Sequence, residues 1–314
     1  MKEIFLGEVI RQRRLELGLT QEELCKGICE PMTISRFENG RQTPSRNRIK
    51  AILQRLGLPD DRFYGLLSNR ELQIRALEEA IISCHVRFER AAPEDKNAIR
   101  EETLQKHCEL MEVMEKDDTL SKQLILRSRY LLGTEHGPYS LDQGLSILLD
   151  AIQLTAPKFD LNQIGLGLYT ENEIKLINNI ALCYLRAGRH YDAIDVLKQL
   201  LRYLQTHLQK VPLNRTHIPM VAFNYARELE VVQRFDEAIE IGEYGKKICI
   251  DYGHYQFLPS ILAVLAECHY HQGNRAESAE LYRQSFYLYK VIEDDANRAI
   301  IQAEAQEFLN LTLA

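Results

Sequence analysis

Residues 19–40, LTQEELCKGICEPMTISRFENG, decide how the N-terminal part of this 314-residue chain folds. Thr20 and Glu23 have the spacing of a capping box, in which each side chain accepts a hydrogen bond from the other residue's backbone N–H, so a helix is expected directly after Thr20. Pro31 has no N–H to donate and disfavours a helical conformation at the residue before it, which ends this helix. A second helix is expected over residues 32–38, because the Asn-Gly pair that follows tolerates positive φ.

Two short helices joined by a tight turn form a helix-turn-helix, whose second helix, the recognition helix, enters the major groove of DNA. Ile34 and Phe37 are spaced to be buried. An arginine can donate two hydrogen bonds to guanine, so we expect Arg36 to read a base while Thr33 or Met32 packs on a thymine methyl group. The expected base-reading set is Met32, Thr33, Ser35 and Arg36. The alternative is a head that makes only protein contacts.

Residues 20–24 (TQEEL) and 34–40 (ISRFENG) resemble the Cro/repressor-like (XRE) helix-turn-helix family. The short turn at 27–29 (GIC) is similar to that of peptide-responsive members of the PlcR/Rgg type. The resemblance implies an ion pair of Arg14 with Glu38 that ties the first helix to the end of the recognition helix. The positions that it assigns to DNA phosphates are Gln21, Asn39 and Arg41; a solvated surface is the alternative for Arg41, Arg46 and Arg48.

Three further helices are expected to complete a five-helix head. One covers residues 3–17, one begins at Pro44-Ser45 and stops at Gly57, and one covers 58–67. We expect an XRE/Cro-type DNA-binding domain at 1–67, a linker at 68–72, and a repeat domain for peptide sensing and dimerisation at 73–314.

Charge is divided unevenly along the chain. Residues 1–70 hold thirteen Lys and Arg against nine Asp and Glu, a net charge of +4. Because the whole chain carries −6, the remainder carries −10. A basic head binds phosphates by releasing counterions, whereas an acidic body is not expected to touch DNA.

Composition and motifs exclude several classes of protein. No run of about 18 apolar residues exists, and Glu3 and Glu8 interrupt any signal-peptide core, so we expect a cytoplasmic protein without a membrane partner. The seven cysteines form no C-x-x-C pair, which favours reduced, packed thiols, with a Cys25–Cys29 redox pair as the alternative. Phosphate-loop and hydrolase motifs are missing, so we expect no enzyme and no cofactor. Residues 268–271 (CHYH) lie on a helix that separates neighbouring side chains, and no metal site is expected.

Beyond residue 71 the sequence is all-α and repetitive. Residues 179–194 align with 224–239 at an offset of 45, and a third copy occupies 264–278. Small residues recur where paired helices must approach closely: Ala181, Ala226 and Ala266, then Ala193, Ala238 and Ser278. These repeats resemble degenerate tetratricopeptide (TPR) repeats. With weaker pairs at 71–116 and 119–156 we expect about five, forming a right-handed superhelix.

A TPR superhelix generally binds extended peptides in its concave groove. Asn179 and Asn224 occupy equivalent positions, and an amide side chain can bridge a ligand's backbone N–H and C=O. Lys175 and Arg227, a turn away, are candidates for a terminal carboxylate or an acidic side chain, with Arg127 as a further candidate. The alternative is that Asn179 caps or solvates a turn.

A repressor-like head joined to a TPR body resembles the peptide-sensing transcription regulators of Gram-positive bacteria, the PlcR/Rgg/PrgX/ComR (RRNPP) family. The resemblance implies a homodimer through the C-terminal repeats, a palindromic double-stranded DNA operator, and a short signalling oligopeptide as allosteric ligand in quorum sensing. Two alternatives remain: a TPR scaffold that sequesters another protein, and an arbitrium-type phage regulator of lysis and lysogeny.

Overall fold

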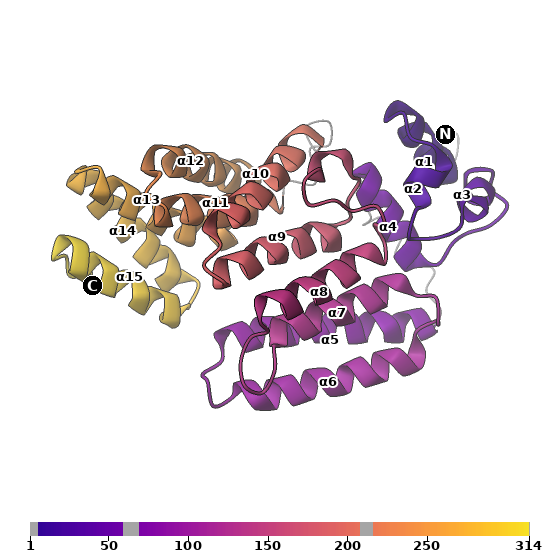
Figure 1. The fold of residues 1–314 in the computed structure, drawn as a ribbon, viewed down its shortest axis with the longest axis horizontal. Coiled ribbons are helices and arrows are strands. Elements are labelled where there is room, and N and C mark those ends of the chain that lie inside the picture. Colours follow the sequence, from indigo (N-terminus) through magenta and orange to yellow (C-terminus); the bar gives the residue numbers. More distant parts are fainter. Residues whose placement is uncertain (1–5, 59–68, 208–215, 314) are drawn as a thin grey trace. The chain divides into compact units, whose positions relative to one another are not determined.

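The computed structural model describes residues 6–58, 69–207 and 216–313, and their regular structure is helical (Figure 1). The only extended pairing in this part of the chain is an isolated bridge of Thr134 with Gly137. The chain forms two compact units, Met1–Cys183 and Tyr184–Ala314. None of the helices in these described ranges has the length and apolarity needed to cross a bilayer. The predicted all-α fold is confirmed.

The head contains α1 (Leu6–Glu16), α2 (Gln21–Cys25), α3 (Pro31–Glu38) and α4 (Arg46–Leu56). The capping box is present, with Thr20 N donating to Glu23 at 2.7 Å and Glu23 N donating to Thr20 at 3.1 Å. Helix α3 begins at Pro31, one residue earlier than expected, because the first helical position needs no N–H. Helix α4 ends at Gly57, whose φ of 64° is left-handed. The expected fifth helix lies outside the described residues, apart from Leu58.

A single apolar core holds the head together. Helix α3 packs against both α1 and α2, and α4 packs against the same two helices. The fully buried side chains include Ile10, Leu24, Ile34, Phe37, Ile52, Leu53 and Leu56. Burial of this inner face of α3 leaves its other face for contacts outside the head.

The first unit continues through α5 (Asn69–Arg90), α6 (Lys96–Val113), α7 (Thr119–Leu132), α8 (Leu141–Gln153), the short helix η2 (Ile164–Leu166) and α9 (Glu171–Arg186). Helices α5 and α6 form one packed pair, α7 and α8 form the next, and α5 also contacts α7 (Figure 1). Much of the segment expected as a linker is helical, since α5 begins at Asn69. The head, α5 to α8 and most of α9 therefore belong to one compact unit that ends at Cys183. The domain boundaries expected from sequence stay a prediction.

The second unit contains α10 (His190–His207), α11 (Ile218–Val231), α12 (Phe235–Tyr252), η3 (Tyr255–Phe257), α13 (Leu258–His271), α14 (Arg275–Val291) and α15 (Asp295–Leu309). Successive helices from α10 to α15 pack on one another, and α11 also contacts α13. The six small residues of the repeats are all fully buried: Ala181, Ala193, Ala226, Ala238, Ala266 and Ser278. Small side chains at these positions let the helix axes approach closely, as the TPR resemblance implies.

Candidate functional site

The outer face of α3 is the candidate nucleic-acid interface. Met32 is 60% exposed and Arg36 is exposed, while Thr33 and Ser35 are half-buried. Residues of this face and of the turn after it line an open pocket of about 500 Å³: Met32, Ser35, Arg36, Asn39, Arg41 and Gln42. The fold thus brings predicted base-reading and phosphate-contacting residues to one surface. Gln42 was not singled out from sequence, and its only signal is its place directly after Arg41.

The three expected phosphate-contacting residues differ in their surroundings. Gln21 donates its amide N–H to Glu38 Oε2 at 2.7 Å, so this side chain is engaged within the head. Asn39 donates to the backbone oxygen of Ser35 at 2.7 Å, which fixes it at the end of α3. Arg41 is exposed in the turn after α3. Of the three, Arg41 has the surroundings best suited to a phosphate.

The ion pair implied between α1 and α3 is present. Arg14 Nε lies 2.6 Å from Glu38 Oε1 and Nη2 lies 2.8 Å from Oε2, a bidentate pair between two buried side chains. Arg14 also donates to the backbone oxygen of Leu19 at 2.8 Å. The hydrogen bond to Glu38 raises the pKa of Arg14. This bridge fixes the C-terminal end of the recognition helix against α1 and the turn before α2.

A buried arginine, Arg55, joins the head to the rest of the first unit. It is 3% exposed on α4, and its guanidinium donates to the backbone oxygens of Leu24 at 2.9 Å and Lys26 at 2.7 Å within the head. It also donates to the backbone oxygen of Thr155 at 3.0 Å and to Glu173 Oε1 at 3.3 Å. Glu173 is fully buried on α9, so one side chain connects α2, α4 and α9.

Close backbone contact surrounds this connection. Gly27, at φ 73°, lies against Thr155, where a Cβ would come within 2.0 Å of the Thr155 backbone oxygen. Thr119 donates its hydroxyl to the backbone oxygen of Gly27 at 2.9 Å, and Thr155 donates its own to Glu173 at 2.5 Å. Sequence reasoning missed Arg55 and Glu173, because a buried ion pair between residues 118 apart leaves no local pattern.

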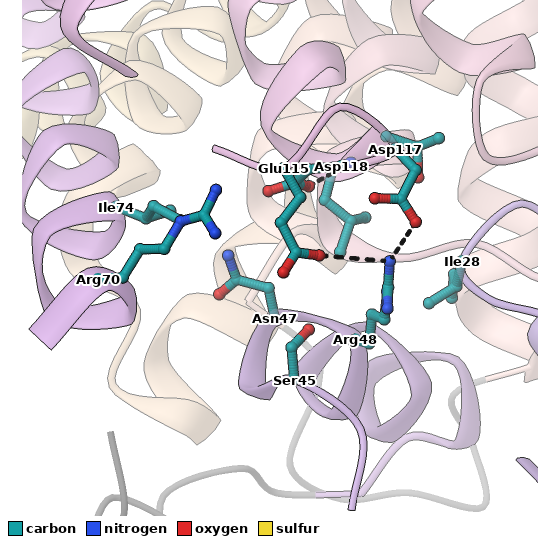
Figure 2. Close-up of a pocket in the computed structure, with 11 residues that line it drawn as sticks. Ile28, Ser45, Asn47, Arg48, Arg70, Ile74, Glu115, Asp117 and Asp118 are labelled. Carbon is teal, nitrogen blue, oxygen red and sulfur yellow. Dashed lines mark hydrogen bonds and ion pairs between the residues drawn. The ribbon is translucent and has the colours of Figure 1, made fainter. Parts of the chain in front are cut away.

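A second, more exposed contact within the first unit involves Arg48. Its guanidinium lies 2.9 Å from Asp117 and 3.9 Å from Glu115, and Figure 2 shows it reaching from α4 toward these two carboxylates. They line a pocket of about 140 Å³ together with residues of α4, α5 and the start of α7. Partly exposed pairs of this kind contribute at most about 1 kcal/mol. Arg48 therefore faces acidic residues of its own chain.

Three of the five candidate peptide-binding residues come together in the first unit. Arg127 on α7 donates Nε to Asn179 Oδ1 on α9 at 3.1 Å. Burial lowers the pKa of Arg127 to about 10, and burial followed by the charge of Arg127 lowers the pKa of Lys175. Two cations thus lie close together beside an amide that is only 6% exposed. The chemistry of this group favours an anionic or carbonyl-bearing ligand.

The other two candidates, Asn224 and Arg227, lie on α11 in the second unit. Asn224 is half-buried. Arg227 donates to Glu267 on α13 and lies 3.5 Å from Glu230 on its own helix. Two carboxylates therefore already face the guanidinium that sequence suggested for a ligand carboxylate. A ladder of Asn179 and Asn224 stays a prediction.

The N-terminal part of the chain matches a known family: residues 10–63 fit a helix-turn-helix family model. Among solved structures, PlcR of Bacillus thuringiensis in complex with the peptide PapR7 and DNA is 20% identical, with 95% of this chain and 98% of that chain covered and a TM-score of 0.57. The apo form of PlcR is 17% identical over 94% and 98% of the two chains, with a TM-score of 0.56.

The SHP pheromone receptor Rgg2 of Streptococcus dysgalactiae is 16% identical over 96% and 99% of the two chains, with a TM-score of 0.48. No curated protein sequence matches the chain. At these identities the likeness to PlcR shows a shared fold, a helix-turn-helix head followed by helical repeats, over nearly the whole of both chains.

Proposed function

We propose that the chain is a transcription regulator that binds operator DNA through α3 and responds to a short signalling peptide bound by its helical repeats. The observation that carries this proposal is the exposed surface formed by Arg36 on α3 and Arg41 in the turn after it, which line one pocket. The Arg14–Glu38 bridge holds the C-terminal end of α3 against α1. The fold shared with PlcR, which has been solved with a peptide and DNA, supports the peptide half.

On DNA, Arg36 would read guanine, and Met32, Thr33 and Ser35 would contact neighbouring base edges. Arg41, Asn39 and Gln21 would set the register on the phosphate backbone; for Gln21 this requires release from Glu38. In the repeats, Arg127, Lys175 and Asn179 would hold an anionic or carbonyl group of the peptide. Within the second unit, taken by itself, Asn224 is the candidate for contact with a peptide backbone.

Helix α9 suggests how a peptide could influence the head. It carries Glu173, which accepts a hydrogen bond from Arg55 of α4, and also Lys175 and Asn179 within the next six positions. A ligand on α9 would therefore act on the helix that holds the head in place. Such a ligand shifts the populations of pre-existing states only if it prefers one of them, and a change from 1:99 to 99:1 needs about 5.5 kcal/mol of preference.

A dimer through the C-terminal repeats would present two heads to a palindromic operator. The half-sites would then be spaced by one helical turn of DNA or a multiple of it. Peptide binding would change the population of the state in which the two heads match this spacing.

The DNA half is tested by selecting bound duplexes from a random DNA pool with the full-length protein. We expect an enriched sequence with two-fold symmetry. Arg36→Ala should relax the preference at one position of each half-site by about 1–3 kcal/mol, roughly tenfold to a hundredfold. Arg41→Ala should weaken binding to all sequences and reduce the salt dependence by about one phosphate contact. Arg202→Ala, at an exposed position on α10, is the control.

An unchanged base preference in the Arg36→Ala protein would remove Arg36 as the base reader. Failure of the wild-type protein to enrich any duplex, at salt concentrations low enough for phosphate binding, would contradict the regulator and favour a sequestering scaffold.

A further inference from the structure

Three carboxylates and one guanidinium gather inside the second unit, from three different helices. Arg227 and Glu230 lie on α11, Glu267 on α13 and Glu304 on α15. Arg227 donates to Glu267 and lies 3.5 Å from Glu230, whose side chain is only 12% exposed. The Glu267 side chain is 8% exposed. One partly exposed positive charge, with 39% of the Arg227 side chain accessible, thus faces three carboxylates, and water has little access to those of Glu230 and Glu267.

The surroundings show that this charge imbalance is unfavourable. Burial raises the pKa of Glu230 and Glu267, and burial together with the charge of Glu267 raises the pKa of Glu304 to about 7. The other charged groups that act on the three carboxylates are Glu228, His271 and Glu307. Of these three neighbours, two are further carboxylates and only His271 can carry a positive charge. The neighbouring residues therefore do not neutralise the excess negative charge of the cluster.

Two polar atoms at the cluster have no hydrogen-bond partner within the described part of the chain. One is Oε2 of Glu304 and the other is the hydroxyl of Tyr282 on α14, and both atoms are buried. Tyr282 is 0% exposed, and the charges that act on its hydroxyl are those of Glu267, Glu304, Arg227 and Glu230. A buried polar group without a partner is unfavourable, so a ligand group that forms hydrogen bonds with these two atoms would be stabilised.

We propose that Glu230, Glu267, Glu304 and Tyr282 form a subsite for a positively charged, hydrogen-bond-donating group of the ligand. This inference rests on the proposed function, because it takes the ligand to be a peptide. An ammonium or guanidinium group would supply both the missing charge and donors for the buried oxygen of Glu304. The source of that group is either a Lys or Arg side chain or the free amino terminus of the peptide.

The geometry favours an organic cation over a metal ion. Across the described residues, no three His, Cys, Asp or Glu side chains converge closely enough to hold a metal. Carboxylates spread over α11, α13 and α15 suit a group with several separate donors instead. The same geometry changes the role of Arg227: with Glu267 and Glu230 against it, the guanidinium orients the carboxylates and is poorly placed to receive a ligand carboxylate.

The proposal is tested with two random heptapeptide libraries, one with free amino termini and one N-acetylated, passed over immobilised full-length protein. Bound peptides are identified by mass spectrometry. We expect a positive group to be enriched about tenfold to a hundredfold, since a charge-assisted hydrogen bond contributes about 1.5–3 kcal/mol. Enrichment of Lys or Arg in both libraries assigns the site to a side chain, and selective retention of the unacetylated library assigns it to the amino terminus.

Glu304→Gln should remove most of this enrichment, whereas Glu277→Gln, at an exposed position on α14, should leave it unchanged. Titration calorimetry of a selected peptide near pH 7, in buffers of different ionisation enthalpy, should show proton release on binding to the wild type and less release with Glu304→Gln. A purely structural glutamate would not produce this difference. Because Gln removes repulsion without changing volume, Glu304→Gln should melt no lower than the wild type at pH 8.

Three results would overturn the proposal. Enrichment of neutral or acidic peptides by the wild type would leave the proposed function standing and remove only the cationic subsite. The same conclusion would follow if Glu304→Gln kept the full preference and the full proton release. If neither library yields a bound peptide, the peptide half of the proposed function fails together with the subsite.

Discussion

At the scale of single residues, two arginines with carboxylate partners, the buried Arg55 and the partly exposed Arg227, have opposite surroundings. Arg55 faces Glu173 and three backbone oxygens, so one charge is matched by one charge and by several acceptors. Arg227 faces Glu267 and Glu230, with Glu304 nearby, so its charge is outnumbered. The first arrangement suits a permanent structural connection, and the second suits a site that a ligand completes.

Breaking the Arg55 connection should be costly. Arg55→Met leaves Glu173 as a buried carboxylate without its cation, and removal of one partner from a buried pair typically destabilises a protein by about 3–5 kcal/mol. Urea denaturation followed by circular dichroism measures the change. The control is Arg189→Ala, which breaks a pair that is 51% and 43% exposed and should leave the urea midpoint close to that of the wild type. A loss below about 1 kcal/mol for Arg55→Met would show that α4 and α9 do not depend on this pair.

Residue roles were only partly predictable. The candidates on α3 lie at one surface because helical spacing alone determines which residues share a face. Arg127 and Asn179 were selected separately from sequence, yet they bond directly. Helical spacing places Glu230 beside Arg227, three residues after it on α11. No spacing rule could reveal the other two carboxylates, because they come from α13 and α15 and meet Arg227 only after packing.

At the scale of helices, α12 packs unusually closely on its neighbours through two glycines. A Cβ on Gly245 would lie 2.9 Å from Ala222 Cβ of α11 and 3.1 Å from Ile261 Cδ1 of α13. A Cβ on Gly242 would lie 2.7 Å from a methyl group of Leu265. Both glycines are buried on a helix, where glycine is intrinsically unfavourable. Their contribution to stability is therefore the close packing of α12 against α11 and α13.

Gly245→Ala should therefore destabilise the second unit although alanine is the better helix former. Alanine gains up to about 1 kcal/mol in helix propensity, but overpacking against a short, rigid Ala222 side chain typically costs about 1–3 kcal/mol. Thermal melting should show a lower midpoint. Gly165→Ala is the matched control, because a Cβ there meets nothing within 4 Å. A midpoint for Gly245→Ala above that of the wild type would mean that α11 and α13 move apart freely.

Helix boundaries were the most predictable feature of the elements. The capping box at Thr20 and the left-handed glycine at position 57 form hydrogen bonds only with residues up to four positions away. The local sequence is therefore enough to predict these helix ends. Pro31 was placed one residue outside its helix, although a proline is compatible with the first helical position. Four packed helix pairs, α5/α6, α7/α8, α11/α12 and α13/α14, match the expected repeats.

At the scale of the whole molecule, four buried titratable groups link stability to pH. His85 and His107 place Nε2 2.6 Å and 2.8 Å from Ser128 Oγ, and burial lowers their pKa values to about 3 and about 4. Burial raises the pKa values of Glu78 and Glu304 to about 7. Below its ordinary pKa of 6.5 an unfolded histidine gains a proton that the folded state excludes, so the histidines lose stability as pH falls.

The two glutamates act in the opposite direction. Between their ordinary pKa of 4.5 and about 7 the folded state holds protons that the unfolded state has lost, so stability falls as pH rises. Between pH 6.5 and 8 the unfolded histidines lose the remaining half of their protons, which favours folding, whereas the folded glutamates lose most of theirs, which opposes folding more strongly. We therefore expect the melting temperature to fall over this interval. The double variant Glu78→Gln/Glu304→Gln should show a smaller fall, and Glu277→Gln should behave as the wild type. A wild-type melting temperature that rises over this interval would contradict the assignment.

The sequence by itself determined the helical class, the repressor-like head, the helix ends and the small residues of the repeats, because these depend on propensities and spacings within a few residues. It also determined the basic head and acidic body. Tertiary structure alone decided that the head shares a compact unit with α5–α9, through Arg55 and Glu173, and that Arg227 is surrounded by carboxylates. Those features depend on which distant side chains become neighbours, and burial then determines how strongly their charges interact.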